Sequence, residues 1–156
     1  MISKIIKHEI NPRLPYTRRS ITKQIVVHCT ATREGRDFTV EDIDRWHKDR
    51  NWNCIGYHLV IYRDGTVHEG RPIWAVGSHV RGYNNTSVGV CYVGGMTADG
   101  RTIKDTRTDA QKEALRVLLQ DLKTLYPNAQ IMGHRDLAPK HCPCFDAYNE
   151  YKDILA

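Results

Sequence analysis

Short apolar runs, separated by amphipathic segments, constrain the fold of this chain more than any other feature of its sequence. The runs cover residues 23–29, 87–93 and 130–133, and they have the length and composition of buried strands. A further pair of segments, residues 57–62 and 66–70, flanks an Asp-Gly turn and predicts a β-hairpin. Strands that alternate with helices predict an α/β domain, and the hairpin makes its central sheet mixed.

Two of the intervening segments have helical signals. Thr39 can cap a helix that begins at the next residue. The longest helix is predicted over residues 108–126, because Thr108 and Gln111 form a capping box and Pro127 prevents continuation. Its predicted buried stripe is Ala114, Leu115, Leu118, Leu122 and Leu125. These helices are expected to flank the sheet.

The first 22 residues differ from the rest of the chain. They mix basic residues, proline and serine without periodicity, so we expect an N-terminal extension over residues 1–22 and one domain over residues 23–156. The formal net charge of +5 favours polyanionic surroundings without choosing among them. Binding of a protein or nucleic acid through this basic arm is an alternative. It predicts that deleting residues 1–22 abolishes binding and that the affinity falls steeply with salt.

The chain has five cysteines, and an odd number argues against a disulfide framework. Cys29, Cys54 and Cys91 lie in apolar contexts and are expected to be buried. Cys142 and Cys144 flank a proline in a loop and are available for metal or redox chemistry. Residues 1–9 show no apolar core of a secretory signal, so we expect a protein that is not exported through one.

Three possible metal ligands stand out in this pattern. His28 and His134 each lie at the end of an apolar run, and Cys142 follows eight residues after His134. Ligand sites often form where the ends of neighbouring strands meet. Two imidazoles and a thiolate can hold zinc, and three protein ligands leave a fourth position open for chemistry. The alternative is that the two histidines are ordinary surface or core residues, because the spacing alone is not specific to zinc.

Four blocks of sequence resemble the N-acetylmuramoyl-L-alanine amidase type 2 family, which includes phage amidase endolysins and peptidoglycan recognition proteins. The blocks are residues 27–32, 56–67, 76–90 and 133–143. They occur in the order that the family has and lie within about residues 24–146. The resemblance implies a zinc hydrolase that cleaves the amide between N-acetylmuramic acid and L-alanine in peptidoglycan.

The resemblance also implies roles for individual residues. The metal ligands would be His28, His134 and Cys142, with Zn²⁺ as the cofactor. Tyr57 and Lys140 would be catalytic, although a packing tyrosine and a solvated lysine are the alternatives. Three further residues would contact the muropeptide: His79, Asn84 and Trp74. Cys144 departs from the family pattern, and its role stays open.

Family members without the zinc cysteine recognise peptidoglycan but do not cut it, so Cys142 favours an enzyme over a recognition module. We expect peptidoglycan as the partner, no specific nucleic acid or membrane partner, and a monomer. The likeness to phage lysins implies that the protein stays in the host cytoplasm before it is released to the cell wall. A bacterial enzyme in the cytoplasm, or one exported by another route, is the alternative.

Overall fold

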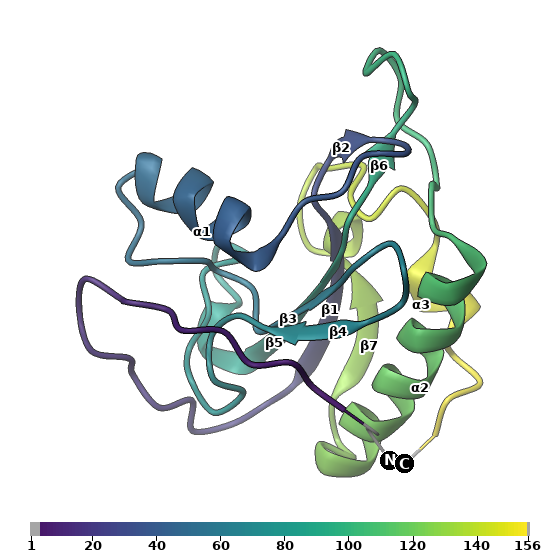
Figure 1. Cartoon of the computed structure of the whole chain (residues 1–156). Helices are drawn as coiled ribbons and strands as arrows, with labels where there is room; N and C mark the ends of the chain where they lie inside the picture. The colour runs from purple at the N-terminus through teal and green to yellow at the C-terminus, as the bar shows by residue number, and fades with distance from the viewer. Residues whose placement is uncertain (1–3, 156) are drawn as a thin grey trace.

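A five-stranded mixed sheet forms the centre of the structure, a computed structural model that describes residues 4–155 (Figure 1). The strands, in the order in which they pair, are β4 (Val67–Glu69), β3 (Leu59–Ile61), β5 (Ser87–Tyr92), β1 (Gln24–Cys29) and β7 (Gln130–Gly133). The central strand β5 is parallel to both β3 and β1, β1 is also parallel to β7, and only β4 is antiparallel. The predicted mixed α/β sheet is therefore confirmed.

A second, two-stranded sheet pairs β2 (Thr32–Arg33) with β6 (Gly95–Met96). The sequence analysis does not predict it, because strands of two residues are too short to show a periodicity. The predicted hairpin forms, but its strands are shorter than expected. Tyr57 and His58 precede β3, although the backbone N–H of His58 still donates to the carbonyl of Gly89 at 3.0 Å.

Three α-helices and two short 3₁₀ helices complete the described chain. They are α1 (Val40–Asp49), η1 (Asn84–Thr86), α2 (Asp109–Leu125), η2 (His134–Asp136) and α3 (Ala147–Glu150). Both predicted caps form: the side chain of Thr39 accepts from the backbone of Asp42, and that of Thr108 accepts from the backbone of Gln111. No helix within residues 4–155 is long and apolar enough to cross a membrane.

The buried face of α2 differs from the predicted stripe at two leucines. Leu125 is 58% exposed, whereas Leu119 is fully buried. At about 100° per residue, Leu119 and Leu125 lie on opposite margins of the buried face, and Leu125 is also the last residue of the helix. Gln111 is also buried, and its side-chain amide donates to the carbonyls of Ile61 and Val93 at the sheet.

The two faces of the sheet are covered by different elements. Ile25 and Val27 of β1 belong to the apolar cluster that includes the buried leucines of α2. Val26 belongs to a smaller cluster that includes Val80 and Met132. Because side chains alternate along a strand, His28 points to the same face as Val26, away from α2. The alternation of β1 therefore places His28 on the face where the candidate site forms.

The segment predicted to be an N-terminal extension packs against the rest of the described chain. Part of the predicted segment, residues 1–3, lies outside the described residues. Ile6 exchanges backbone hydrogen bonds with Val67 and Glu69 of β4, at 2.8 and 2.9 Å. The guanidinium of Arg19 donates to the carbonyls of Ile73 and Ala75 at 2.8 and 2.9 Å. Backbone pairing and a buried arginine thus hold the described part of the arm against β4 and against residues 73–75.

His58 is a fully buried histidine with both ring nitrogens in use. Nε2 donates to the carbonyl of Ala75 at 2.7 Å, and Nδ1 accepts from the backbone N–H of Gly89 at 3.0 Å. Burial lowers the pKa of His58 to about 3, with a smaller contribution in the same direction from the charge of Arg19. Protonation would convert the Nδ1 acceptor to a donor that faces another donor.

We expect acid to destabilise the fold through this histidine. The unfolded chain binds the proton near pH 6.5 and the folded chain only near pH 3, so the free energy of unfolding falls as the pH decreases between these values. The slope should reach about 1.4 kcal/mol per pH unit for this group. Urea unfolding at several pH values, with any metal removed by a chelator, measures this slope. The His58→Asn variant should give a shallower slope. Equal slopes in the two proteins would contradict the prediction.

Candidate metal centre

Three side chains meet at the carboxyl ends of the parallel strands β1 and β7. His28 is the fifth residue of β1, His134 directly follows β7, and Cys142 lies in the loop after η2. One ligand atom from each lies within 4.8 Å of the other two. Among the described residues this is the single group of three or more such side chains that could hold a metal ion.

A chain of hydrogen bonds sets the protonation of His28. The hydroxyl of Ser87 donates to the carbonyl of Tyr83 at 2.7 Å, so its oxygen accepts from Nε2 of His79 at 3.1 Å. Nδ1 of His79 must then accept, and Nε2–H of His28 donates to it at 2.8 Å. This network assigns the proton of His28 to Nε2 and leaves the lone pair of Nδ1 free to bind a metal.

Cys142 faces this lone pair. Its Sγ lies 3.8 Å from Nδ1 of His28 and accepts from the backbone N–H of Cys29 at 3.1 Å. The thiolate is the form of cysteine that binds metals. The loop approaches closely because residue 133 is glycine: a Cβ there would lie 2.8 Å from the ring of Pro143.

Both candidate imidazoles are held in the neutral form. Burial lowers the pKa of His28 well below its usual value, and the neighbouring histidines, first His79, lower it further. Burial also lowers the pKa of His134, and the charge of Lys140 contributes. Neutral imidazole is the form that ligates metals. His28 is 1% exposed, whereas His134 and Cys142 are only partly buried, so the group opens to solvent on one side.

Tyr57 and Lys140 lie beside this group. Both line a cavity of about 250 Å³ that also includes His134 and Cys142. The ring of Tyr57 is 5.1 Å from that of His28, centroid to centroid. Burial raises the pKa of Tyr57 well above its usual value, so its hydroxyl keeps its proton. The cavity therefore offers a phenolic donor and an ammonium group next to the candidate ligands.

A second cavity of about 540 Å³ continues from the first, because His134 and Lys140 line both. Its other polar and aromatic walls include Trp52, His79 and Arg81. Neither cavity has an aspartate or glutamate among its lining residues, so the described cleft is basic. Trp52 and Arg81 were not among the predicted site residues. A Trp in the turn after a predicted helix was the available signal, but it does not show which way the turn folds.

The three predicted substrate-binding residues occupy different places. His79 is 8% exposed and lines the larger cavity while its ring supports His28. Asn84 also lines it, and its side-chain oxygen accepts from the backbone of His79 and Val80 at 2.8 and 2.9 Å. Trp74 is 38% exposed but lines neither cavity. It packs against the arm, with Arg18 over its ring at 4.7 Å.

The remaining cysteines and His141 are not members of the ligand group. Cys29, Cys54 and Cys91 are buried as predicted, and all five cysteines are free. Cys144 turns toward the other face of the sheet, where its Sγ lies 3.8 Å from that of Cys29. Neither Cys144 nor His141 belongs to the group that could hold a metal.

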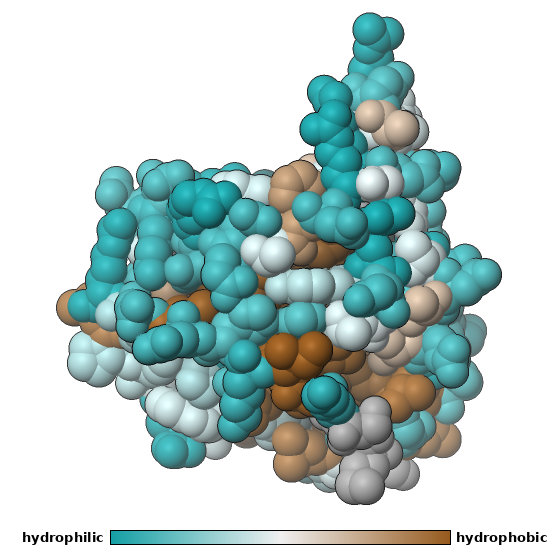
Figure 2. Space-filling model, in the orientation of Figure 1, coloured by the Kyte–Doolittle hydropathy of each residue, from teal (hydrophilic) through white to brown (hydrophobic). Residues whose placement is uncertain are grey.

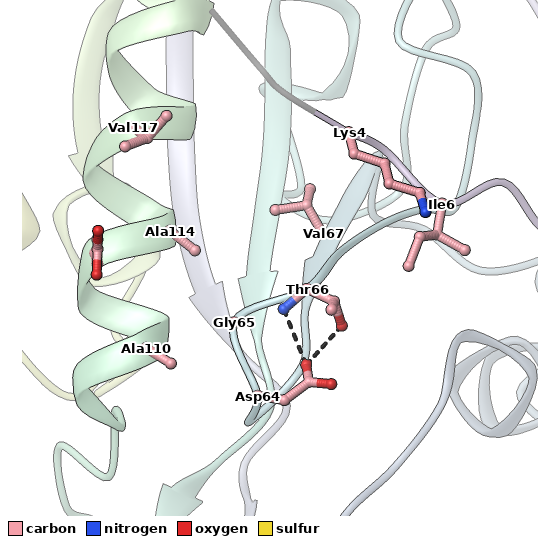
Figure 3. Close-up of a pocket in the computed structure, with 10 residues that line it drawn as sticks. Lys4, Ile6, Asp64, Gly65, Thr66, Val67, Ala110, Ala114 and Val117 are labelled. Atoms are coloured by element: carbon pink, nitrogen blue, oxygen red, sulfur yellow. Dashed lines mark hydrogen bonds between the residues drawn. The ribbon is translucent and has the colours of Figure 1, made fainter.

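Another cavity, of about 400 Å³, lies away from these residues. It is bounded by the arm, the β3–β4 turn and α2, and Figure 3 shows Val67 and Ile6 across from Ala114 and Val117. Figure 2 shows apolar side chains gathered in the lower middle of a mostly hydrophilic face. The walls of this cavity include no candidate ligand and no catalytic candidate, so it is not part of the site.

Comparison with known proteins agrees with the geometry. The sequence profile described as N-acetylmuramoyl-L-alanine amidase matches residues 17–145. The chain belongs to this amidase family. The match begins inside the predicted N-terminal extension and includes all three candidate ligands. The family resemblance found in the sequence is thereby confirmed.

Individual members of the amidase family are close in sequence and in structure. The endolysin of Klebsiella phage KP32 is 52% identical over 134 residues, which are 86% of this chain and 88% of that protein. The endolysin of Escherichia phage T7 is 45% identical over the same fractions of the two chains. The structure of the amidase LysC from Clostridium intestinale superposes with a TM-score of 0.81 at 30% identity, and it covers 96% of this chain and 95% of that one.

The likeness extends to peptidoglycan recognition proteins. A structure of the ectodomain complex of the recognition proteins LCa and LCx, bound to tracheal cytotoxin, has a TM-score of 0.78 at 27% identity and covers 96% of this chain and 95% of that one. The amidase fold is thus shared by enzymes and by proteins named for recognition. The residues of the site, rather than the fold, must therefore decide between the two activities.

Proposed function

We propose that this protein is a zinc-dependent peptidoglycan amidase that hydrolyses the bond between N-acetylmuramic acid and the L-alanine of the stem peptide, and that it acts as a phage endolysin. The observation that carries the proposal is the group of His28, His134 and Cys142, open to a cavity that Tyr57 and Lys140 line. The amidase family and the phage endolysins at 45–52% identity support the substrate and the reaction.

The donor atoms fit zinc. Two imidazole nitrogens and a thiolate are preferred zinc ligands, and three protein ligands are typical of catalytic sites. In a tetrahedral site, a sulfur and a nitrogen ligand are roughly 3.6 Å apart. The observed 3.8 Å between Sγ of Cys142 and Nδ1 of His28 is close to this separation. When bound here, zinc would supply a Lewis acid that activates water and polarises the scissile carbonyl.

The other residues of the cavity supply charge and protons. Lys140 is a flexible ammonium group at the cavity wall, and it can hold the oxyanion that develops when the amide carbonyl is attacked. Tyr57 keeps its phenolic proton and can donate a hydrogen bond to the attacking water or to the carbonyl oxygen. His79 holds His28 in the tautomer that presents Nδ1. Asn84 organises the turn that carries His79.

The partners follow from this activity. We propose peptidoglycan as the substrate, with Arg81 and Trp52 in the wall of the cleft that receives it. The protein would act as a monomer, without a specific nucleic-acid or membrane partner. As an endolysin, like the relatives that carry this name, it would stay in the host cytoplasm until it is released to the cell wall.

We expect the protein to release stem peptides from purified peptidoglycan. Mass spectrometry should detect free peptides that begin with L-alanine. A chelator should abolish them because the activated water is lost, and added zinc should restore them.

Two other outcomes would contradict the proposal. Cleavage that continues in chelator would exclude a metal-dependent reaction. Peptidoglycan that is bound but left intact by zinc-loaded protein would instead favour a recognition module. A Tyr57→Phe variant serves as a matched control for the assay, since it should keep zinc while turnover falls.

A further inference from the structure

Tyr92 is a buried residue whose polar group is directed at the loop that carries Cys142. It is the last residue of β5 and is 1% exposed. Its hydroxyl donates to the backbone carbonyl of Pro143, the residue after Cys142, at 2.7 Å. Pro143 is itself buried, so a donor of the protein rather than bulk solvent satisfies this carbonyl.

The loop crosses the carboxyl end of β1 and reaches both faces of the sheet. On one face, Sγ of Cys142 lies 3.8 Å from Nδ1 of His28. On the other face, Tyr92 belongs to the apolar cluster that includes the buried leucines of α2, as does Cys29, its partner in the register of β1 and β5. Tyr92 therefore holds the loop from the side opposite the candidate ligands.

Two consecutive carbonyls fix the backbone that follows the ligand. The carbonyl of Cys142 accepts from the backbone N–H of Arg135 at 2.7 Å, and the carbonyl of Pro143 accepts from Tyr92. The first bond ties the loop to η2, and the second ties it to the central strand of the sheet. The hydroxyl of Tyr92 thus joins the ligand loop to the most rigid part of the fold.

The loop ends on a second support. The ring of Phe145 lies 6.2 Å from that of Tyr92, centroid to centroid, and the guanidinium carbon of Arg107 lies 3.4 Å from the centroid of the Phe145 ring. Asp105 and Glu150 each accept two hydrogen bonds from Arg107, at 2.8–2.9 Å. A short segment between this clamp and η2 is left for the hydroxyl of Tyr92 to position.

We propose that Tyr92 is a positioning residue of the metal centre: its hydroxyl holds the carbonyl of Pro143 and so keeps the thiolate of Cys142 beside the two candidate histidine ligands. The inference rests on the proposed function, since it takes zinc as the metal. Tyr92 lines neither cavity of the site, so it acts through the loop and not on the substrate.

The expected effect falls on the metal-free protein. A loop that the fold already holds in its binding position needs no reordering when the metal arrives, whereas a released loop must first be ordered. If Cys142 of the Tyr92→Phe variant occupies this position about one tenth of the time, the apparent Kd for zinc rises about tenfold. This value is at the lower end of the roughly 10–100-fold range for groups that support metal ligands.

The test measures the Kd for zinc by titrating the zinc-loaded, full-length protein with a chromogenic chelator. Tyr92→Phe keeps the ring that packs near Phe145 and removes the hydroxyl alone. Tyr62→Phe is the matched control. Its hydroxyl also holds a backbone group, since it accepts from the N–H of Val40 at 2.8 Å, but Tyr62 lines neither cavity of the site.

We expect the Kd for zinc to rise about tenfold in Tyr92→Phe and to stay unchanged in Tyr62→Phe. With zinc in excess, kcat of Tyr92→Phe should be near that of the unmodified protein, because every molecule then has its ligands assembled. A Kd within twofold of the unmodified protein would overturn the inference even if the thermal midpoint falls, since the hydroxyl would then stabilise the fold without positioning the ligand. An equal rise in Tyr62→Phe would overturn it as well, because it would indicate a general loosening.

Failure of the proposed function gives a different result. If the unmodified protein binds one zinc but leaves peptidoglycan intact, the amidase proposal fails, and the ratio of the two Kd values still decides the role of Tyr92. If the unmodified protein takes up no zinc, the proposed metal centre and the role of Tyr92 are overturned together.

Discussion

Cys142→Ser is expected to remove both the metal and the activity. The serine hydroxyl is a poor zinc ligand at neutral pH, since it stays protonated where the thiol ionises. Loss of a residue that merely supports a metal ligand costs roughly 10–100-fold in affinity or activity, so loss of the ligand itself should exceed this range. Zinc content after gel filtration and the rate of stem-peptide release are the measurements.

Cys144→Ser is the matched control for this substitution. It replaces a thiol two residues away, whose Sγ faces Cys29 and lies outside the ligand group. It should keep zinc and turnover. One zinc per chain in Cys142→Ser, or loss of zinc in Cys144→Ser, would show that the ligand set has been assigned wrongly.

Lys140→Ala is expected to separate metal binding from turnover. Lys140 lines both cavities and is not a member of the ligand group, so the variant should bind zinc normally. Removal of one group that stabilises an oxyanion typically lowers kcat by about 10²–10³-fold. Steady-state kinetics on a soluble muropeptide, together with zinc analysis, measures both properties.

Lys112→Ala provides the corresponding control, because Lys112 is an exposed lysine on α2 and lines none of the cavities of the site. It should leave kcat and KM unchanged. Full activity of Lys140→Ala would mean that another group holds the oxyanion, and loss of zinc would mean that Lys140 shapes the ligand loop.

Much of the arrangement could be predicted from local sequence. The capping boxes at Thr39 and Thr108 set where two helices begin, and both form as predicted. The metal group could be predicted because His28 and His134 end apolar runs, and parallel strands bring such ends to one edge of a sheet. Each of these signals lies within a few residues of the sequence, even where the residues that meet in the fold are far apart.

Other features depend on how distant segments fold onto each other. The sequence cannot show that Trp74 packs against Arg18 of the arm, or that the turn after α1 brings Trp52 to the cleft. The role of His79 is of the same kind. Its contact with His28 depends on the register between β1 and β5, since Ser87 begins β5. Leu125 was mispredicted because a margin position of a helix is buried only where a neighbour covers it.

The wide separation of the ligands along the chain has a consequence for synthesis. His28 and Cys142 are 114 positions apart, and β1, which carries the first ligand, pairs with β7 just before the second. A ribosome must therefore pass residue 142 before the three ligands exist together. Every product that terminates before residue 142 lacks the thiolate, so such fragments lack a complete ligand group.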